Sequence, residues 1–583
     1  MYILNKLFYL ILLQFLMFPV LKTSGQINNE STIRLNQIGY PITSAKIAIL
    51  MGKDAKEFMV VSAKGGKVIY KGKPGLPVRE RYGDGMIQIL DFSSIKHPGY
   101  YKILVPGVKS SYIFKIGNEI YRGVSAASIK SYYYQRTGIA LEKQYAGIWR
   151  RNEGHPDTSI YVHSSAADLQ RPEGFKFSSP RGWYDAGDYN KYIVNSGITM
   201  ATLLSAYEDF PEYSKSLKLN IPESKDALPD LLNEALWNLR WMLTMQDPGD
   251  GGVYHKLTNA AFDGMVMPEA ALNKRYVIVK TTAATLDLAA VMAQSARVFS
   301  KFPNELPGLA DSCLTAATKA WKWASLHPDA IYDQELMNSK FEPAITTGAY
   351  SDKEVSDEKL WAGTELYLTT KNEIYLKGIN FAPAAIDVPS WPDVSTMAYY
   401  SLISNRVLLS GKIADISDSL AKKLILAADQ FVIQADKNPW KSVVGEKEDF
   451  IWGSNAVASN QGMLLLKAYQ LKKNPAYLLA IQSNIDYLLG RNATDFCFVT
   501  GYGSHSPMHI HHRPSIADGI AAPVPGLLAG GPNPGQQDKC SYPSSLPDRS
   551  YADIDCSYAS NEVAINWNAP LVYLLYGASS IVK

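Results

Sequence analysis

The chain has 583 residues, which exceeds one ordinary core and predicts two or more domains. Hydrophobic residues make up 46% of the sequence, enough for a sizeable core, and charged residues only 19%. The net charge of +3 comes without a basic stripe, which argues against a nucleic-acid-binding protein. The 36 tyrosines and 11 tryptophans suit sugar surfaces, but such rings also fill cores.

The first residues, MYILNKLFYLILLQFLMFPVLKTSGQ, have the pattern of a signal peptide. Lys6 precedes an apolar run from Leu7 to Val20, and small residues follow it. The run is shorter than the ~20 residues that span a bilayer. We therefore expect residues 1–25 to be a signal peptide. The mature chain would then be exported, to the periplasm, the cell surface or the medium, with no membrane span.

Residues 31–117 contain short runs of β-branched and aromatic residues separated by turn residues, such as AKIAILMG and GYYKILVP. This pattern is typical of an all-β sandwich of immunoglobulin type. The segment has no cysteine, so the bridge of antibody domains is absent. We expect this module to be structural.

After Gly117 the hydrophobic period becomes helical. Helices are predicted near 119–138, 193–209, 227–245, 281–300, 309–326, 355–368, 394–407, 412–436, 454–473, 475–489 and 559–577. With one further irregular segment they could form a barrel of antiparallel helix pairs. A helical solenoid is the alternative, but no fixed-period repeat supports it. The long loops 143–192 and 491–555 are expected to shape a functional face.

The chain has four cysteines. Cys313 and Cys497 lie in apolar surroundings and are expected to be buried thiols. Cys540 and Cys556 flank a loop, and export would permit a disulfide between them. Spacing does not fix their geometry, so the bridged and free states both stay open.

Two aspartates lie three residues apart in RGWYDAGDYNKY, residues 181–192. One of them could cap the helix expected to begin near Lys191. Capping does not account for two carboxylates among so many aromatic rings. Two close carboxylates can bind a water while one of them abstracts its proton. The stretch therefore predicts a water-activating pair, Asp185 and Asp188.

Glu562 is expected at the start of the last helix, in YASNEVAINWNAP. A glutamate near a helix N-terminus is usually a surface residue favoured by the helix dipole. Here the apolar residues Val563, Ala564 and Ile565 follow, which indicates a buried helix. Burial raises the pKa of a carboxyl, so Glu562 could act as a general acid near neutral pH.

His509, His511, His512 and Arg513 crowd into FVTGYGSHSPMHIHHRPS, residues 498–515. Metal binding is one interpretation, but no spacing pairs these histidines with a carboxylate or cysteine pair of known type. We prefer the interpretation that they donate hydrogen bonds to sugar hydroxyls.

Together these segments resemble the signatures of glycoside hydrolase family 9. GWYDAGDYNKY resembles the catalytic aspartate motif, and VTGYGSHSPMHIHHRPS the histidine signature. The segments MQDPGDGGVYHK, FIWGSNAVASNQG and IRLNQIGYP also resemble family segments, the last being the start of an immunoglobulin-like module found in one subgroup. The C-terminal signature is matched by Tyr551, Asp553, Tyr558, Glu562, Ala564, Asn568 and Ala569. The resemblance covers nearly the whole mature chain.

The resemblance implies an immunoglobulin-like sandwich at 31–117 and an all-α (α/α)6 barrel at 118–583 that cleaves β-1,4-glucosidic bonds with inversion. It implies that Asp188 is the general base, that Asp185 helps to hold the nucleophilic water, and that Glu562 is the general acid. Inversion needs these carboxyls on opposite faces of the sugar, roughly 6.5–9.5 Å apart, to leave room for the water. The implied substrate-binding residues are Tyr184, His255, Trp391, Trp452, His511, Arg513 and Trp567. For each tryptophan, burial in the core is the alternative.

Several positions depart from the family pattern. Arg181 stands where glycine is usual and would either tune the base or face solvent, and Ile510 replaces a common proline. Relatives with the same N-terminal module often hold zinc with cysteines and histidines. His155 and His163 remain here, but no cysteine is near, and thiolates hold structural zinc tightly. We expect no zinc.

TTGAYSDKEVSDEKLWAG resembles the segment that binds calcium in many family members. Thr347, Asp352, Asp357 and Glu358 supply the hard oxygens that calcium prefers. VSDE also fits a plain helix-capping motif. We expect a structural Ca²⁺ here, with capping as the alternative.

The main functional hypothesis is an endo-β-1,4-glucanase, a cellulase acting on cellulose or related β-glucans. The alternatives are the same chemistry on xyloglucan or mixed-linkage glucan, exo action on cello-oligosaccharides, and a non-catalytic carbohydrate-binding protein. The presence of all three carboxylates disfavours the last. We expect a monomer whose partner is a polysaccharide.

Overall fold

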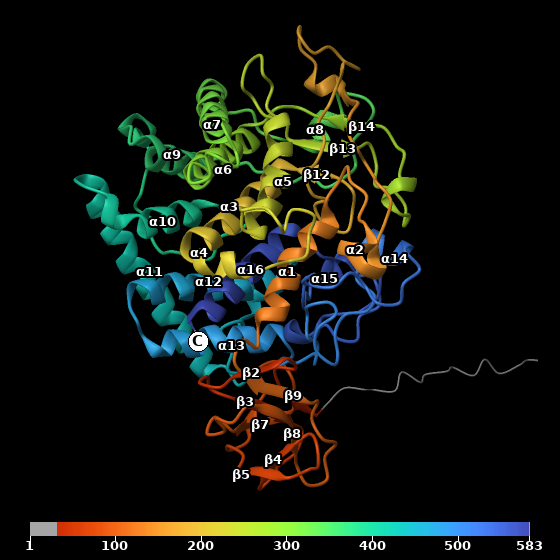
Figure 1. The fold of residues 1–583 in the computed structure, drawn as a ribbon, viewed down its shortest axis with the longest axis vertical. Helices are drawn as coiled ribbons and strands as arrows, with labels where there is room; N and C mark the ends of the chain where they lie inside the picture. Colours follow the sequence, from red (N-terminus) through yellow and green to blue (C-terminus); the bar gives the residue numbers. More distant parts are fainter. Residues whose placement is uncertain (1–31, 582–583) are drawn as a thin grey trace, which may run out of the picture.

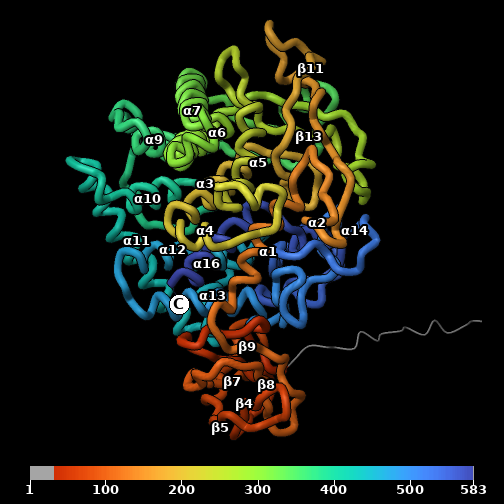
Figure 2. Tube along the Cα trace, in the orientation of Figure 1, coloured from red at the N-terminus to blue at the C-terminus, as the bar shows by residue number. Residues whose placement is uncertain are grey.

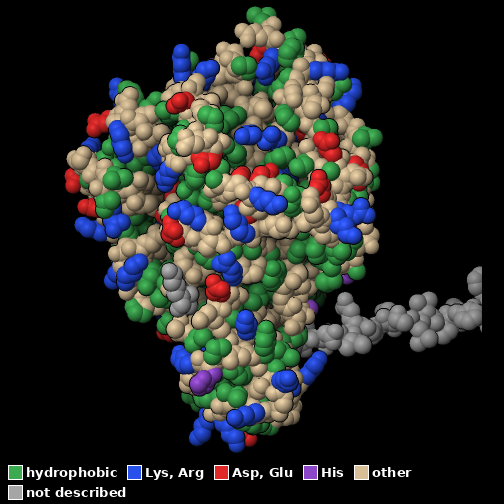
Figure 3. All heavy atoms as spheres, in the orientation of Figure 1, with side chains coloured by type: hydrophobic (Ala, Val, Ile, Leu, Met, Phe, Trp, Pro, Cys, Tyr) green, Lys and Arg blue, Asp and Glu red, His purple; other side chains and the backbone are tan. Residues whose placement is uncertain are grey.

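The computed structural model describes residues 32–581, so the predicted signal peptide lies outside the described residues. A β-sandwich module lies at one end of the molecule, against a larger helical domain (Figures 1 and 2). Within residues 32–581, no helix is long and apolar enough to cross a membrane. On the face shown in Figure 3, basic and acidic side chains are interspersed.

The N-terminal module consists of two sheets. One has the order β1 (Ile33–Arg34), β3 (Ile47–Met51), β7 (Met86–Asp91), β6 (Val78–Arg79). The other has the order β2 (Gly39–Pro41), β9 (Phe114–Gly117), β8 (Gly99–Leu104), β4 (Phe58–Ser62), β5 (Val68–Gly72). Between the sheets, Tyr40 packs edge-on against Phe92 and Phe114, with ring centroids 5.4 and 5.7 Å away. The predicted sandwich is confirmed; only the two-residue strand β6 was not predicted.

The helices alternate along the chain between an inner ring and an outer layer. The inner helices are α3 (Ile193–Asp209), α6 (Thr282–Phe299), α9 (Ser356–Thr370), α10 (Ser395–Ser404), α12 (Ser454–Leu471) and α16 (Ile565–Ile581). The outer helices are α1 (Arg122–Gln135), α5 (Asp230–Thr244), α7 (Leu309–Leu326), α11 (Lys412–Lys437) and α13 (Pro475–Leu488). Between α9 and α10 the outer layer holds the 3₁₀ turn η4 (Glu373–Leu376). This arrangement confirms the predicted (α/α)6 barrel.

The ring closes where the last helix meets the first helices of the domain. Helix α16 packs against α1, α3 and α12 (Figure 1). Asn568 of α16 donates a 2.7 Å hydrogen bond to the Ser128 carbonyl in α1. Segments from the two ends of the domain therefore lie side by side.

A third sheet lies in the long loops and was not predicted. Its order is β11 (Lys176–Phe177), β10 (Ile160–Val162), β14 (Arg275–Val277), β13 (Lys256–Asn259), β12 (Lys191–Tyr192). Strand β12 is the end of the aspartate-bearing bend, and Lys191 pairs with Leu257. The sheet therefore anchors that bend to the loops around it.

Buried polar contacts fasten the sandwich to the barrel. Arg34 Nη1 forms a 2.9 Å ion pair with Asp495 Oδ2, and both side chains are almost fully buried. Asn36 Nδ2 donates to Asp486 Oδ1 at 2.9 Å. Glu80 pairs with Arg549, in the loop that leads to Glu562. The two parts are thus joined by specific, desolvated contacts.

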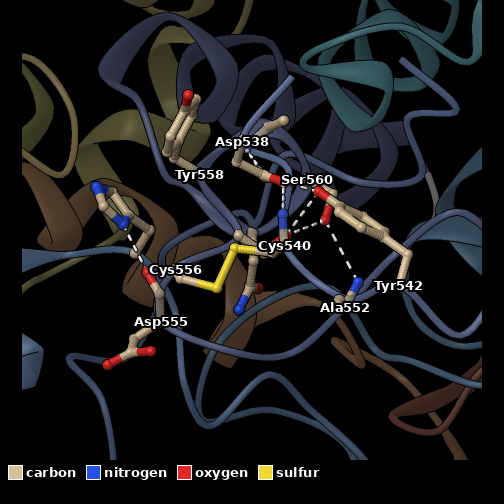
Figure 4. The surroundings of a disulfide bond; sticks show 12 residues. Asp538, Cys540, Tyr542, Ala552, Asp555, Cys556, Tyr558 and Ser560 are labelled. Carbon is tan, nitrogen blue, oxygen red and sulfur yellow. Dashed lines mark hydrogen bonds between the residues drawn. A yellow bond between two sulfur atoms is a disulfide. The ribbon is translucent and has the colours of Figure 1, made fainter. Parts of the chain in front are cut away.

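Cys540 and Cys556 are joined by a disulfide, with Cα atoms 6.3 Å apart (Figure 4). Cys313 and Cys497 are buried free thiols, as predicted. Short helices complete the loops: α2 (Lys143–Ala146), α4 (Pro211–Ser216), α8 (Gln334–Asn338), α14 (Arg513–Ala517) and α15 (Tyr558–Asn561).

Candidate active site

Asp185 and Asp188 are both buried in the bend between α1 and α3. Asp185 accepts hydrogen bonds from Asn195 Nδ2 at 2.6 Å and from the Tyr350 hydroxyl at 2.7 Å. Asp188 Oδ2 accepts from Asn190 Nδ2 at 2.6 Å and from the Tyr192 hydroxyl at 3.2 Å. Among residues 32–581, Asp188 Oδ1 has no hydrogen-bond partner. That oxygen is therefore available to accept a proton.

Burial acts on the pKa of both carboxyls. Burial, together with the neighbouring Asp188 charge, raises the pKa of Asp185 to about 8. Burial also raises the pKa of Asp188, but the bond from Asn190 and the Arg513 charge oppose this rise. Hydrogen bonds oppose the rise at both carboxyls, but only at Asp188 do nearby positive charges, those of Arg513 and Arg275, also favour the ionised form.

Arg513 fixes the backbone between the two aspartates. Its N–H and Nη1 both donate to the Gly187 carbonyl, at 3.0 and 2.9 Å. A Cβ on Gly187 would lie 2.1 Å from the His511 carbonyl oxygen, so only glycine fits this close approach. The aspartate bend and the histidine segment are thus packed backbone to backbone.

A buried ion network holds the other side of the bend. Asp157 forms ion pairs with Lys191 Nζ at 2.8 Å and Arg275 Nε at 2.7 Å. Arg275 also donates from Nη1 to the Tyr189 carbonyl at 2.9 Å. The network joins the loop after α2 to the bend. Asp157 was missed by the sequence reasoning, because no motif points to a lone aspartate in a loop.

His155 and His163 lie in the same loop region. His155 Nδ1 bonds the Tyr184 hydroxyl at 2.8 Å. The His163 nitrogens bond Ser165 Oγ at 2.9 Å and the Pro343 carbonyl at 2.9 Å. His163 has no free nitrogen for a metal ion in this arrangement. The expected lack of zinc stays a prediction.

Glu562 lies in an extended segment between α15 and α16, so the predicted continuous helix 559–577 is wrong. The His511 N–H donates to the Asn561 carbonyl at 3.0 Å, and the Gly530 N–H donates to the Glu562 carbonyl at 2.8 Å. These contacts to neighbouring strands replace helical hydrogen bonds. The backbone of Glu562 is therefore held by neighbouring segments of the chain, and Glu562 does not belong to the first turn of α16.

The Glu562 side chain is half-buried. Its pKa is raised well above the ordinary value, first by burial and then by the Asp188 and Asp185 charges. The start of α16 is also tied to the bend, because the Ile565 N–H donates to the Asp185 carbonyl at 2.9 Å. Three carboxyls from opposite ends of the domain therefore form one site. The raised pKa of Glu562 favours its protonated form.

His511 is half-buried beside these carboxyls. Its Nδ1 contacts the Asp555 carbonyl oxygen at 2.6 Å, near the disulfide (Figure 4), which leaves Nε2 without a protein partner. Tyr558 lies 5.8 Å from the His511 ring and 5.5 Å from the Trp452 ring. Trp452 is 41% exposed. The Tyr558 ring therefore lies between those of His511 and Trp452 and contacts both.

Two other predicted tryptophans lie close to this group. Trp567 packs on Gly453, where a Cβ would lie 2.6 Å from the indole nitrogen. Trp391 packs edge-on against Tyr350 at 5.1 Å. Tyr350 in turn bonds Asp185, so Trp391 stands one ring away from the carboxyl pair. Tyr350 was missed by the sequence reasoning, because a lone tyrosine in a loop carries no signal.

Three predicted substrate-binding residues are engaged with protein groups. Tyr184 is fully buried. His255 is buried as well, and its nitrogens contact Thr281 Oγ1 at 3.0 Å and the Ala349 carbonyl at 2.8 Å. The structure thus places neither ring at a surface that a sugar could touch. Arg513 donates from Nε to the Asp263 carbonyl at 2.9 Å, beside its bonds to Gly187. A sugar contact by Arg513 stays a prediction.

Arg181 has φ of 67°, the left-handed conformation that explains why glycine is usual there. Its guanidinium lies 4.8 Å over the Trp237 ring. The positive charges that act on Asp188 are those of Arg513 and Arg275. Of the two roles open for Arg181, tuning the base is therefore not supported.

Acidic side chains gather between α6 and α9. Glu358 and Asp287 are buried, and none of their four carboxyl oxygens has a hydrogen-bond partner in the described part of the chain. Burial and the neighbouring Asp287 charge raise the pKa of Glu358 to about 11. Asp352 and Asp357 add to the same negative field. Uncompensated buried carboxyls are costly, and a cation would relieve that cost. Asp287 was missed by the sequence reasoning.

Thr347 does not belong to this acidic group. Its hydroxyl contacts Thr258 Oγ1 at 2.6 Å and accepts from Lys256 Nζ at 3.1 Å. The hydroxyl is already engaged with these protein groups, and the role of Thr347 as a calcium ligand stays a prediction. Among residues 32–581, no three His, Cys, Asp or Glu side chains already converge as a metal-binding group. The donor chemistry fits calcium, but the carboxyls would have to close around it.

The sequence matches known families along most of its length. Residues 121–575 match "Glycosyl hydrolase family 9", and residues 28–110 match "Cellulase N-terminal ig-like domain". The chain is 45% identical over 548 residues to the xyloglucan-specific endo-β-1,4-glucanase BoGH9A of Bacteroides ovatus, covering 94% of this chain and 93% of that protein. It is 32% identical over 555 residues to endoglucanase D of Acetivibrio thermocellus, covering 94% of this chain and 83% of that protein.

Solved structures of family 9 glycoside hydrolases also superpose on this chain. A Bacteroides ovatus GH9 structure superposes with a TM-score of 0.91 at 44% identity, covering 95% of this chain and 99% of that one. The GH family 9 endoglucanase J30 superposes with a TM-score of 0.84 at 31% identity, covering 92% and 99%.

Proposed function

Since this chain belongs to glycosyl hydrolase family 9, we propose that it is an inverting endo-β-1,4-glucanase with Asp188 as general base and Glu562 as general acid. Asp185 would share in holding the nucleophilic water. The observation that supports this most directly is the pairing of an unpartnered, buried Asp188 Oδ1 with a glutamate whose pKa is raised. The Asp188 carboxylate can accept a proton, and the protonated Glu562 carboxyl can donate one.

In the proposed reaction, water bound between Asp185 and Asp188 attacks the anomeric carbon. Asp188 takes the proton of that water as the new C–O bond forms. Glu562 gives its proton to the glycosidic oxygen as the old C–O bond breaks. Attack and departure occur on opposite faces of the ring, so the configuration inverts. His511 Nε2 and the Trp452 ring are proposed to hold sugar units next to the cleaved bond.

For the polymer, we propose xyloglucan ahead of cellulose. The support is the relative that shares 45% identity over 94% of this chain and acts on xyloglucan. The chain's other relatives include endoglucanases and a cellodextrinase, so cellulose, mixed-linkage glucan and cello-oligosaccharides are the competing substrates.

A substrate screen tests this proposal. Initial rates would be measured on tamarind xyloglucan, carboxymethyl cellulose, mixed-linkage glucan and cellohexaose, together with solution viscosity. We expect the highest kcat/KM on xyloglucan and a rapid fall in viscosity, as endo cutting requires. Release of short products without a fall in viscosity would contradict the endo mode. Higher kcat/KM on carboxymethyl cellulose would contradict the xyloglucan preference.

We also propose a structural calcium ion at the acidic group between α6 and α9, held by Asp352, Asp357, Glu358 and Asp287. When bound, such an ion would neutralise buried carboxyls and fix α9 against α6. The support is the set of unpartnered oxygens on Glu358 and Asp287. Export by a signal peptide within residues 1–25 is likewise proposed, because polymeric glucans lie outside the cell.

A further inference from the structure

The loop that joins β13 to β14 (Figure 1) carries several exposed apolar side chains. Phe262 is 47% exposed, Met265 43% and Val266 37%. Exposed apolar groups that gather on one loop often mark a binding surface. The function derived above uses none of these three residues.

This loop is fixed directly to the catalytic bend. The Tyr189 hydroxyl, one residue after Asp188, donates to the Val266 carbonyl at 2.5 Å. Arg513 Nε donates to the Asp263 carbonyl at 2.9 Å, while its Nη1 holds the Gly187 carbonyl. The loop is therefore anchored at two points to groups that flank the proposed base.

The same arginine contacts the Phe262 ring. The Arg513 guanidinium carbon lies 5.5 Å from the ring centroid. One face of the ring thus carries a cation that also holds the backbone between Asp185 and Asp188, and nearly half of the side chain remains open to solvent. An aromatic ring held in this way loses little conformational freedom when a ligand covers it.

We propose that Phe262 is a further substrate-binding residue, on which one pyranose ring of the glucan chain stacks next to the cleaved bond. Pyranose rings present flat C–H faces that pack on aromatic rings, and their hydroxyl edges suit polar groups beside them. Met265 is a second exposed apolar side chain on the same loop. This inference rests on the proposed glucanase function and deepens it by assigning a subsite.

The test compares Phe262→Ala with Phe262→Trp and with Leu272→Ala. Leu272 lies on the same loop and is 86% exposed, so its removal controls for loss of any exposed apolar group there. KM and kcat would be measured on xyloglucan oligosaccharides and cellohexaose, and Tm would report the fold. We expect Phe262→Ala to raise KM about threefold to tenfold, the worth of one aromatic contact, with a smaller change in kcat and an unchanged Tm. Phe262→Trp should keep a KM close to that of the unaltered protein.

Equal KM values for Phe262→Ala and Leu272→Ala would overturn the inference. So would a loss of activity in Phe262→Ala that comes with a lower Tm and is not restored by Phe262→Trp. In either case the unaltered protein would still hydrolyse glucan, so the proposed function would stand. Failure of the proposed function would instead appear as no activity in the unaltered protein on any β-1,4-glucan.

Discussion

The Tyr350 hydroxyl donates a 2.7 Å hydrogen bond to Asp185 Oδ2. This bond favours the ionised carboxyl and opposes the rise in the pKa of Asp185 to about 8. Tyr350 also packs against Tyr192, which bonds Asp188, with ring centroids 4.8 Å apart. Tyr350 therefore acts on both members of the pair that holds the water.

Tyr350→Phe should move the acidic limb of the activity profile to higher pH. Loss of the hydrogen bond makes the ionised form of Asp185 less stable, so the pKa of Asp185 rises further. The pair then ionises only at a higher pH. The limb would be read from kcat/KM measured across pH. Tyr469→Phe, an altered tyrosine on α12 away from the carboxyls, should leave the profile unchanged. A limb that stays in place, or moves to lower pH, in Tyr350→Phe would contradict this role.

The contribution of Asp185 to conformational stability should fall as pH rises. The pKa of Asp185 is about 8 in the folded protein against an ordinary 3.8, so the folded state binds its proton more tightly. The resulting stability is complete below the ordinary value and is lost as pH rises through the folded value. Urea unfolding at pH 5 and pH 8 measures the difference in the free energy of unfolding. Asp185→Asn should reduce that difference, and an undiminished difference would argue against the raised pKa.

Replacement of the proposed acid or base should remove activity without unfolding the protein. Asp188→Asn and Glu562→Gln keep the size of each side chain but cannot exchange the proton. Each should lower kcat about 10²–10⁴-fold, the usual contribution of general acid–base catalysis. Circular dichroism and Tm should match the unaltered protein. Near-normal turnover in either variant would refute its assignment.

Calcium should raise the Tm of protein that has been treated with a chelator. Binding to the folded state alone stabilises it by mass action. Glu358→Gln and Asp287→Asn should lose most of this response, because each removes a charged ligand. Glu354→Gln, an exposed glutamate in the same segment, should keep it. A Tm that does not respond to calcium in the unaltered protein would end the calcium proposal.

The buried ion pair between Arg34 of the sandwich and Asp495 of the barrel should contribute more to the free energy of unfolding than an exposed ion pair does. Arg34→Ala would leave Asp495 charged and buried at the interface, at a cost of about 3–5 kcal/mol. The free energy of unfolding measures this change. The control is Lys215→Ala, because the pair between Lys215 and Glu212 is exposed. Its loss should change the free energy of unfolding far less, because solvent screens an exposed pair. Similar effects for both variants would mean that the interface does not depend on this pair.

Sequence patterns predicted the long elements well. Helices α3 and α7 have the bounds that the apolar period predicts, because apolar residues recur at helical spacing along the whole of each segment. The carboxyls of the site were predicted from motif resemblance, and the structure brings all three together. Their roles stay predictions until the variants above are measured.

Other features depended on contacts between distant segments. Residues after Asn561 leave the helix because the backbone pairs with His511 and Ala529 instead. The sheet of β10 to β14 has strands of two to four residues, too short to give a periodic pattern. Asp287 lies in an ordinary helical sequence, and only packing against α9 places it beside Glu358.

The stereochemistry of the first product tests the central claim most directly. Proton NMR can follow the anomeric signals of cellohexaose or a xyloglucan oligosaccharide during the first minutes of hydrolysis. Water activated by Asp188, on the face opposite Glu562, must give the α-anomer first, with the β-anomer rising only by mutarotation. Initial release of the β-anomer would contradict the assignment of Asp188 as a base that activates water.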